Sequence, residues 1–452
     1  MTAPQPGPRL ASSAPAVVAR PRNDSPDVLT RAAESVTRFG LPAFILCLPL
    51  EFTSQFLPLQ VARIVLLVVG IAFGYLLLTR RRTLVLPLSA SAALLALYGV
   101  VSIASWIFTR APGSTKLVGD LVAYSLMAVL AINLVQSDEQ HRGAWTAFLV
   151  SALLIAVLGA FLYYAGLSIW RADPDHLGRL NVTFGDPNIS ARFFNLAICA
   201  AILMNAARQS PAWLSIATIV VASAIFPLTF SKSGYAIFII TVLLVVPLAI
   251  DRRRAAAMAG VALVVFAVAI AINTDTRDRA SIVIHSFAPA APSAQSSTGS
   301  TPSLAGGTID PVRSYLISAG WQMFRDHPLT GVGFGGFQHA LVTTYERYVP
   351  ANPPATLSHT SAITMLSEQG LIGAGIFSAF LVLLFWEMLG SIRRRAPERL
   401  WVVMPAVLIV PIVAYSQFEG RFIEEPYLWL AIGLFFAARA LESPTRAIHL
   451  GA

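Results

Sequence analysis

Apolar runs recur along the whole chain, and the short connections between them carry most of the charged residues. An α-helix of roughly 20 apolar residues crosses the ~30 Å hydrocarbon core of a bilayer. The pattern predicts twelve crossings, at about residues 39–57, 61–79, 84–108, 116–136, 144–167, 189–207, 211–228, 234–250, 256–273, 358–389, 400–416 and 424–441. We therefore expect an all-α fold, a polytopic membrane helical bundle built from most of the chain.

Composition supports the membrane class. The 452 residues are 56% hydrophobic and 12% charged, whereas soluble proteins carry about 25% charged residues. A net charge of +9 could indicate a nucleic-acid partner. However, the basic residues lie in short clusters between the apolar runs, which is typical of topology signals. We expect membrane lipids as partners and no nucleic acid.

The basic clusters alternate along the chain. Every second connection is basic, as expected if the amino terminus is cytoplasmic, although Arg63, Arg110 and Lys116 lie on the opposite side. The basic connections contain Arg80–Arg82, His141-Arg142, Arg208, Arg252–Arg254 and Arg393–Arg395. An even number of crossings then places both termini in the cytoplasm.

The crossings divide the chain into five segments. These are a disordered cytoplasmic tail (1–38), crossings one to nine (39–273), a large external loop (274–357), crossings ten to twelve (358–441) and a cytoplasmic tail (442–452). In the second half of the loop, Asp310-Pro311 is a good helix start and Pro328 a good stop. The apolar residues between them recur at helical spacing, which predicts an amphipathic helix on the membrane surface.

The stretch "LSHTSAITMLSEQGLIG" places His359 and Glu368 at the entry to a long apolar run. A straight helix from Ser358 would exceed the hydrocarbon thickness, so Glu368 would lie near the outer boundary and His359 about 13 Å further out. A neutral imidazole there can accept a proton at neutral pH. The alternative is a histidine that only hydrogen-bonds its own loop.

A second polar group occurs in "NVTFGDPNISARFFN". Asp186 and Asn188 flank a proline in a turn that leads into a helix, and Arg192 falls about one turn inside that helix. Arginine within a crossing usually faces a cavity or a partner. A structural ion pair between Arg192 and Asp186 is the alternative to a binding role.

Further charges fall on the same external face. Lys232 in "TFSKSGYA" and Arg313 on the external helix are cations that could instead be merely solvated. The short connection "SQFEGRFIEEPY" has acidic residues around Arg421, for which mutual ion pairing is the simplest interpretation. Together these cations suit an anionic lipid head group such as a pyrophosphate. The sequence shows no metal-ligand spacing, which favours chemistry without a metal.

Several stretches resemble a known family. The string "DPVRSYLISAGWQMFRDHPLTGVGFGGF", followed by "SHTSAITMLSEQGLIG", resembles the signature region of the O-antigen ligase and O-antigen polymerase superfamily. Members carry an Arg and a Trp on an external helix, then Pro-Leu-x-Gly-x-Gly, a His at a helix start and Glu-x-Gly-Leu-x-Gly. The strings "FGDPNISA" and "TFSKSG" resemble two further segments, so the similarity covers about 184–373 in patches.

This resemblance implies an enzyme of the bacterial inner membrane with its active site on the periplasmic side. It implies a metal-independent, inverting glycosyltransfer that needs no cofactor. The donor would be a glycan linked to undecaprenyl pyrophosphate, and the acceptor a hydroxyl of lipid A-core. A polymerase, which uses a second lipid-linked repeat unit as acceptor, is the close alternative. A non-catalytic transporter or scaffold is the alternative from another class.

The resemblance also assigns residues. His359 matches the general base, and Arg313 matches an arginine that binds the pyrophosphate. Lys232 stands where many members have Arg, which keeps the charge but loses the bidentate fork. Thr360 stands where Asn commonly follows the His. The remaining substrate-binding candidates are Asp186, Asn188, Arg192 and Glu368.

Overall fold

The computed structural model describes residues 27–170, 178–287, 311–350, 360–393, 399–442 and 447–450. The first half contains α1 (Val28–Cys47), η1 (Glu51–Gln55), α2 (Val61–Leu78), β1 (Leu84–Pro87), α3 (Ala90–Thr109), α4 (Thr115–Leu134), α5 (Asp138–Tyr164), α6 (Pro187–Ala206), α7 (Ala212–Ile225) and η3 (Phe226–Thr229). The second half contains α8 (Lys232–Leu248), α9 (Arg252–Ile272), α10 (Thr274–Phe287), α11 (Pro311–Asp326), α12 (Phe337–Thr343), η4 (Glu346–Tyr348), α13 (Ser361–Ile392), α14 (Arg399–Glu419), α15 (Pro426–Glu442) and β2 (Ala447–Leu450).

A helix corresponds to each predicted crossing, and the all-α expectation holds apart from one small ribbon. Among the described residues, nine helices are long and apolar enough to cross a membrane: α2 to α6, α7 with η3, α9, α13 and α14. The helix α8 is apolar but has only 17 residues. The count of twelve crossings therefore stays a prediction.

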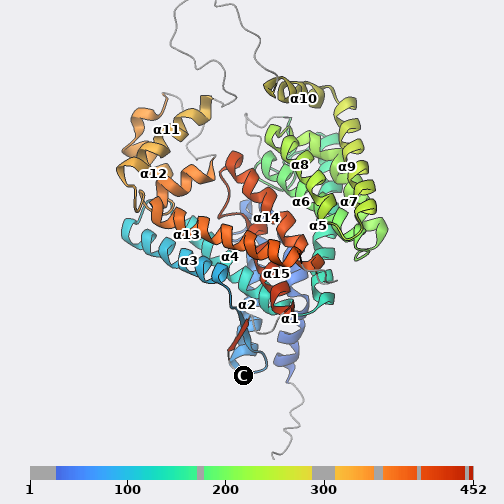
Figure 1. The fold of residues 1–452 in the computed structure, drawn as a ribbon, viewed down its shortest axis with the longest axis vertical. Helices are drawn as coiled ribbons and strands as arrows, with labels where there is room; N and C mark the ends of the chain where they lie inside the picture. The colour runs from blue at the N-terminus through green and yellow to red at the C-terminus, as the bar shows by residue number, and fades with distance from the viewer. Residues whose placement is uncertain are drawn as a thin grey trace, which may run out of the picture.

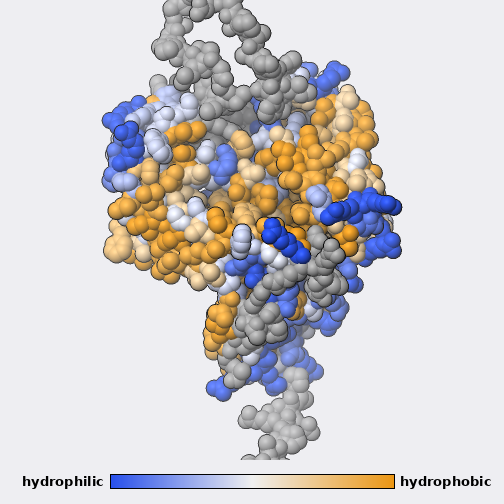
Figure 2. All heavy atoms as spheres, in the orientation of Figure 1, coloured by the Kyte–Doolittle hydropathy of each residue, from blue (hydrophilic) through white to orange (hydrophobic). Residues whose placement is uncertain are grey.

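The helices form one bundle with two distinct ends. Figure 1 shows the start of α1 and the carboxyl-terminal strand at the lower end, and α10, α11 and α12 at the opposite end. We call this opposite end the outer end. Hydrophobic side chains cover most of the visible flank in Figure 2, whereas hydrophilic residues gather near α11 and α12 and at the lower end. This distribution fits a bundle surrounded by lipid.

The first helix begins earlier than the apolar run suggests. Residues 28–38, which we expected in the disordered tail, form the first turns of α1. The Asp27 carboxylate accepts a hydrogen bond from the Thr30 amide at 2.7 Å and so caps the helix. The helix ends at Cys47, and the rest of the expected first crossing is a turn followed by η1.

The third crossing also differs from the prediction. Residues 84–87 form β1, which pairs antiparallel with β2 from the carboxyl-terminal segment, so α3 begins only at Ala90. On its other side, the Asn133 side chain accepts from the Val85 amide at 2.7 Å and donates to the Val85 carbonyl at 3.0 Å. Polar backbone groups in this apolar stretch are thus satisfied by contacts from distant parts of the chain.

The external segment has a small core of its own. The described part of this segment contains α10, α11, α12 and η4. Helix α11 occupies the span predicted for the amphipathic helix, and it buries Leu316, Ala319 and Met323 against Phe337 and Leu341 of α12. Its Gly320 lies so close to Ile363 that a methyl group there would overlap the isoleucine side chain. The first turns of α13 therefore hold α11 at the outer end.

Candidate functional site

The outer end of α14 joins three other helices. The Tyr415 hydroxyl donates a hydrogen bond to the Gly234 carbonyl in the first turn of α8, at 3.3 Å. The next residue, Ser416, accepts a hydrogen bond through its carbonyl from the Ser361 hydroxyl at 2.8 Å. Ser361 begins α13. The starts of α8 and α13, which follow two candidate segments far apart in the sequence, are thus attached to consecutive residues of α14.

The buried Arg192 connects α6 to the same end of α14. Its side chain is 1% exposed and forms ion pairs with Glu419, at 3.2 Å, and with Glu425. It also donates to the Arg421 carbonyl at 3.2 Å. An isolated buried charge costs several kcal/mol, so paired partners are expected here. The ion pair that we weighed between Arg192 and Asp186 is wrong, because the partners are the last residue of α14 and a residue of the connection that follows it.

Arg421 forms the second half of this charged cluster. Its guanidinium donates to both carboxylate oxygens of Glu51, and it lies 3.7 Å from the Glu425 carboxylate. Burial alone would lower the pKa of Arg421, but the adjacent Glu51 and Glu425 carboxylates outweigh burial and raise it well above its usual value. The mutual pairing expected within the connection 420–425 is therefore only part of the network, since Glu51 comes from η1.

Asp186 and Asn188 shape the start of α6. The Asp186 carboxylate accepts from the Asn188 amide at 2.7 Å, which is the N-cap predicted from the Asp-Pro-Asn turn. The Asn188 side-chain oxygen accepts from the Arg179 guanidinium at 3.0 Å, and Arg179 also donates to the Thr229 carbonyl at 3.0 Å. These bonds connect the segment before α6 to the segment before α8.

Lys232 is the one site candidate with an exposed side chain that the structure describes. It is the first residue of α8, directly after Ser231, whose hydroxyl accepts from the Gly234 amide at 3.1 Å. Within the described chain Lys232 has no ion pair. Its ammonium group is therefore available to an anion at the outer end.

Glu368 holds the glycine-rich loop between α11 and α12. Its two carboxylate oxygens accept from the Gly335 amide at 2.9 Å and the Phe337 amide at 3.1 Å. Its backbone carbonyl accepts from the Gly333 amide at 2.9 Å, and the side chain is almost fully buried. All three acceptors face the loop. Glu368 thus fixes the position of this loop.

A kink in α13 accompanies this contact. Gly370 has φ 59° and ψ −159°, which breaks the helical conformation inside α13. The loop backbone occupies the space that a side chain at Gly370 would need, since the amides of Leu371 and Ile372 donate to the carbonyls of Pro328 and Leu329 at 2.8 and 3.1 Å. The expected straight helix from residue 358 is therefore wrong, and the 13 Å separation estimated along its axis has no basis.

Two of the predicted residues cannot be placed in the site. His359 lies outside the described residues, one residue before the Thr360 cap of α13. Arg313 lies in the first turn of α11, but only its backbone is described. Within the described ranges, no group of three or more His, Cys, Asp or Glu side chains is placed to hold a metal ion.

With this geometry established, comparison with known families is informative. A model of the O-antigen ligase family matches residues 217–378. Over these residues the chain is similar to the O-antigen ligase family. The match supports the O-antigen ligase and polymerase superfamily expected from the sequence. No curated protein matches the chain significantly.

The matched residues run from α7 to the middle of α13, and they include Lys232, Arg313, His359 and Glu368. The charged cluster around Arg192 and Arg421 lies outside the matched residues but attaches to the same end of α14. Sequence reasoning missed Tyr415 and the partnership of Glu51. Glu51 lies inside an expected apolar crossing, and an ionisable residue at such a position usually has a charged partner. This was the signal that could have indicated its ion pair.

Proposed function

We propose that the protein is an O-antigen ligase-type glycosyltransferase. In this proposal it moves a glycan from undecaprenyl pyrophosphate to an acceptor hydroxyl of lipid A-core at the periplasmic face of the inner membrane. The observation that carries the proposal is the match of residues 217–378 to the O-antigen ligase family. The attachment of the starts of α8 and α13 to Tyr415 and Ser416 supports it, because α8 begins with the candidate cation Lys232 and α13 closely follows the candidate base His359 in the sequence.

The proposed chemistry is a single displacement without a metal. The acceptor oxygen attacks the anomeric carbon of the donor sugar, and the bond from that carbon to the pyrophosphate oxygen breaks. His359 takes the hydroxyl proton as the new bond forms, which makes the oxygen a better nucleophile. Attack opposite to the leaving group inverts the anomeric configuration. Undecaprenyl pyrophosphate leaves with the bonding electrons.

Fixed cations assist where negative charge develops on the leaving group. We assign this role to Arg313 on α11 and Lys232 at the start of α8. Lys232 has an exposed side chain, which supports this assignment. Their charges are supplied by the protein chain, so the proposed reaction uses no cofactor.

We assign positioning roles to the other candidates. Arg192 already has ion pairs with Glu419 and Glu425, and Glu368 accepts three backbone hydrogen bonds. Asp186 and Asn188 likewise use their side chains within the start of α6. These contacts support a role in holding the substrate-binding loops in place. In the proposal both termini lie in the cytoplasm.

A glycan profile tests the proposal and separates it from its alternatives. We would compare lipid-linked and surface glycans by gel from a strain lacking this gene and from the complemented strain. Long chains that accumulate on undecaprenyl pyrophosphate would support a ligase. Single repeat units without a ladder would instead identify a polymerase. An unchanged profile would contradict both and favour a transporter or scaffold.

A further inference from the structure

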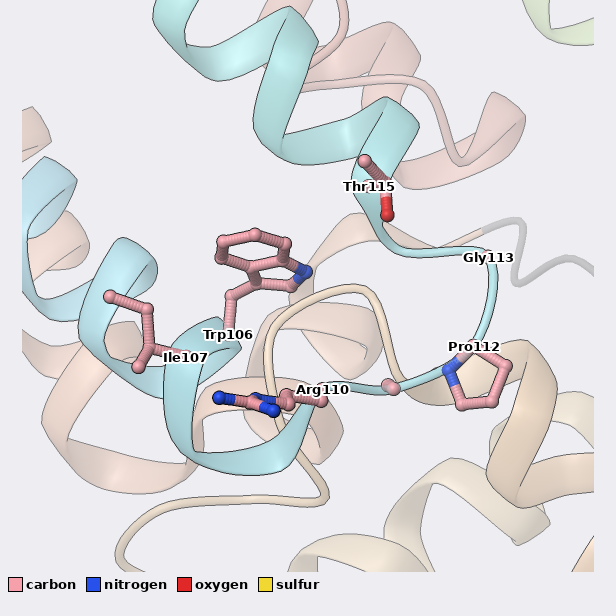
Figure 3. A pocket seen from close by; sticks show the side chains of 7 residues that line it. Trp106, Ile107, Arg110, Pro112, Gly113 and Thr115 are labelled. Carbon is pink, nitrogen blue, oxygen red and sulfur yellow. The ribbon is translucent and has the colours of Figure 1, made fainter.

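A pocket opens at the outer end of α3, where the chain turns into α4. Its volume is about 370 Å³, and its lining includes Trp106, Ile107, Arg110, Gly113 and Thr115. Figure 3 shows the Trp106 indole and the Arg110 guanidinium on the same side of the turn that joins α3 to α4, with Thr115 at the start of α4. The pocket thus combines an aromatic ring, a cation and a hydroxyl.

The pocket lies where the apolar surface of the bundle ends. Ile107 is 50% exposed and Phe108 is 86% exposed. Both belong to the last turn of α3, a helix apolar enough to cross a membrane. The polar turn begins immediately afterwards at Arg110. Tryptophan followed by a basic residue at the end of a crossing is typical of the level of the lipid head groups.

Arg110 has an unusual backbone for its residue type. It follows α3 with φ 47° and ψ 38°, a left-handed conformation at a helix end that glycine adopts most readily. Within the described chain, its guanidinium has neither an ion pair nor a hydrogen bond. The pocket is therefore lined by a guanidinium whose donors are unpaired within the described chain. Its backbone conformation is one that favours glycine.

The start of α4, where Thr115 lines the pocket, adds further donors. The Ser114 hydroxyl donates to the Ala111 carbonyl and does not cap the helix. Among the described atoms, no acceptor is found for the first-turn amides of Thr115, Lys116 and Leu117. These amides and the exposed Lys116 side chain carry positive charge or partial charge, and they add to the attraction of Arg110 for an anion at the mouth of the pocket.

We propose that this pocket binds the phosphate of an anionic phospholipid from the outer leaflet. Arg110 would hold the phosphate through paired N–H donors, a geometry that suits phosphate oxygens. The exposed side chains of Ile107 and Phe108 would contact the acyl chains below. This apolar surface directly beneath the cation is the reason to assign a lipid and not free phosphate.

The bound lipid would also support the glycine-rich loop. A side chain at Gly333 would overlap Thr109, and the Phe334 amide donates to the Ser105 hydroxyl at 3.1 Å. The turn at Arg110 therefore lies against the same loop that Glu368 holds from the other side. A lipid seated on this turn would restrict its motion. The proposal concerns a lipid site of the resting protein, and it does not depend on the transfer reaction.

The test compares two arginines with the same backbone conformation. Arg80 has φ 55° and lies after α2 at the opposite end of the bundle. Arg110→Gly and Arg80→Gly each remove one guanidinium at a left-handed position, where glycine relieves strain and preserves the fold. Retention of phosphatidylglycerol by the purified protein is measured by native mass spectrometry without glycan donor, and phosphatidylcholine, a zwitterion with no net charge, is the reference.

We expect Arg110→Gly to reduce retained phosphatidylglycerol about tenfold, the change expected from loss of a charge-assisted hydrogen bond. Arg80→Gly and wild type should retain equal amounts, and phosphatidylcholine should be unaffected. Equal loss in both variants, or no loss in either, would overturn the proposal. So would binding of inorganic phosphate that depends on Arg110 and is as tight as that of the lipid, because the source would then be soluble phosphate.

Discussion

Arg421 and Glu51 are 370 positions apart in the sequence and form a bidentate ion pair, with N···O distances of 3.1 and 2.7 Å. The pair connects the segment after α14 to η1, which follows the first helix. Its side chains are 20% and 11% exposed, so water screens the pair only in part. The connection after α14 is thereby fixed to η1 beside Arg192.

Glu51→Ala should destabilise the protein because it leaves Arg421 largely buried without its main partner. We expect a loss of about 2 kcal/mol in the free energy of unfolding, somewhat below the value for a fully buried pair. Denaturant unfolding in detergent measures this change. Glu346→Ala is the matched control, since Glu346 is exposed. Equal stability of the two variants would show that the pair contributes nothing measurable.

Gly331→Ala should displace the loop that Glu368 holds. Gly331 has φ 64°, and an added methyl group would overlap the Glu368 backbone. The strained conformation alone costs an alanine about 1–2 kcal/mol. Gly375→Ala is the control in α13, where nothing lies within 4 Å of the added carbon. Gly331→Ala should unfold at a lower temperature and complement a deletion strain less well than Gly375→Ala. Equal unfolding temperatures and equal complementation would contradict a tightly packed loop.

His359→Ala should abolish most of the proposed transfer activity. Loss of a general base typically reduces a rate by about 10²- to 10⁴-fold. Transfer by purified protein in liposomes measures the effect. His339→Ala, an exposed histidine in α12, should keep the wild-type rate. Full activity of His359→Ala would exclude this histidine as the base.

Arg313→Ala should reduce transfer more than Arg313→Lys does. Lysine keeps the positive charge for the pyrophosphate but loses the planar fork of donors. We therefore expect intermediate activity for the lysine variant. Arg325→Ala, at the exposed end of the same helix, controls for loss of a charge on α11. Identical rates for Arg313→Ala and Arg313→Lys would argue against a pyrophosphate contact.

The contact between Tyr345 and Asp326 should make the external segment sensitive to acid. The Tyr345 hydroxyl donates to the Asp326 carboxylate at 2.9 Å, and this bond, followed by the one from Gln322, lowers the pKa of Asp326. Burial and Asp326 raise the pKa of Tyr345 to about 12, so the phenol stays protonated at neutral pH. A carboxyl group whose pKa is lowered in the folded state stabilises the fold at pH values above its ordinary, unfolded pKa. This stabilisation is lost as the pH falls through the pKa of the folded state.

Tyr345→Phe should therefore return the pKa of Asp326 toward its ordinary value. Titration of the carboxyl carbon by NMR measures this directly. Proteolysis of the segment 326–349 should also become less dependent on pH between neutral and acidic solution. Tyr348→Phe is the control, because Tyr348 ends the short 3₁₀ helix η4 that Tyr345 precedes. An unchanged Asp326 titration in Tyr345→Phe would refute the assigned cause.

Local sequence signals were sufficient for most of the bundle. Apolar runs long enough to cross a bilayer gave helices at the expected places, because backbone groups in lipid must bond within their own segment. The start of α6 was also predicted, since the Asp186-Pro187-Asn188 turn leads directly into the helix. The amphipathic spacing after residue 310 likewise predicted α11. Each of these features depends on neighbours within a few positions.

Contacts between distant segments were decided only by the tertiary structure. The sequence offered Arg192 several acidic partners, and packing of α6 against α14 selected Glu419 and Glu425 over Asp186. The kink at Gly370 exists because a loop from another part of the chain occupies its inner side. Helix formation is set by short-range hydrogen bonds, but the choice of partner for a buried charge depends on which helices lie side by side.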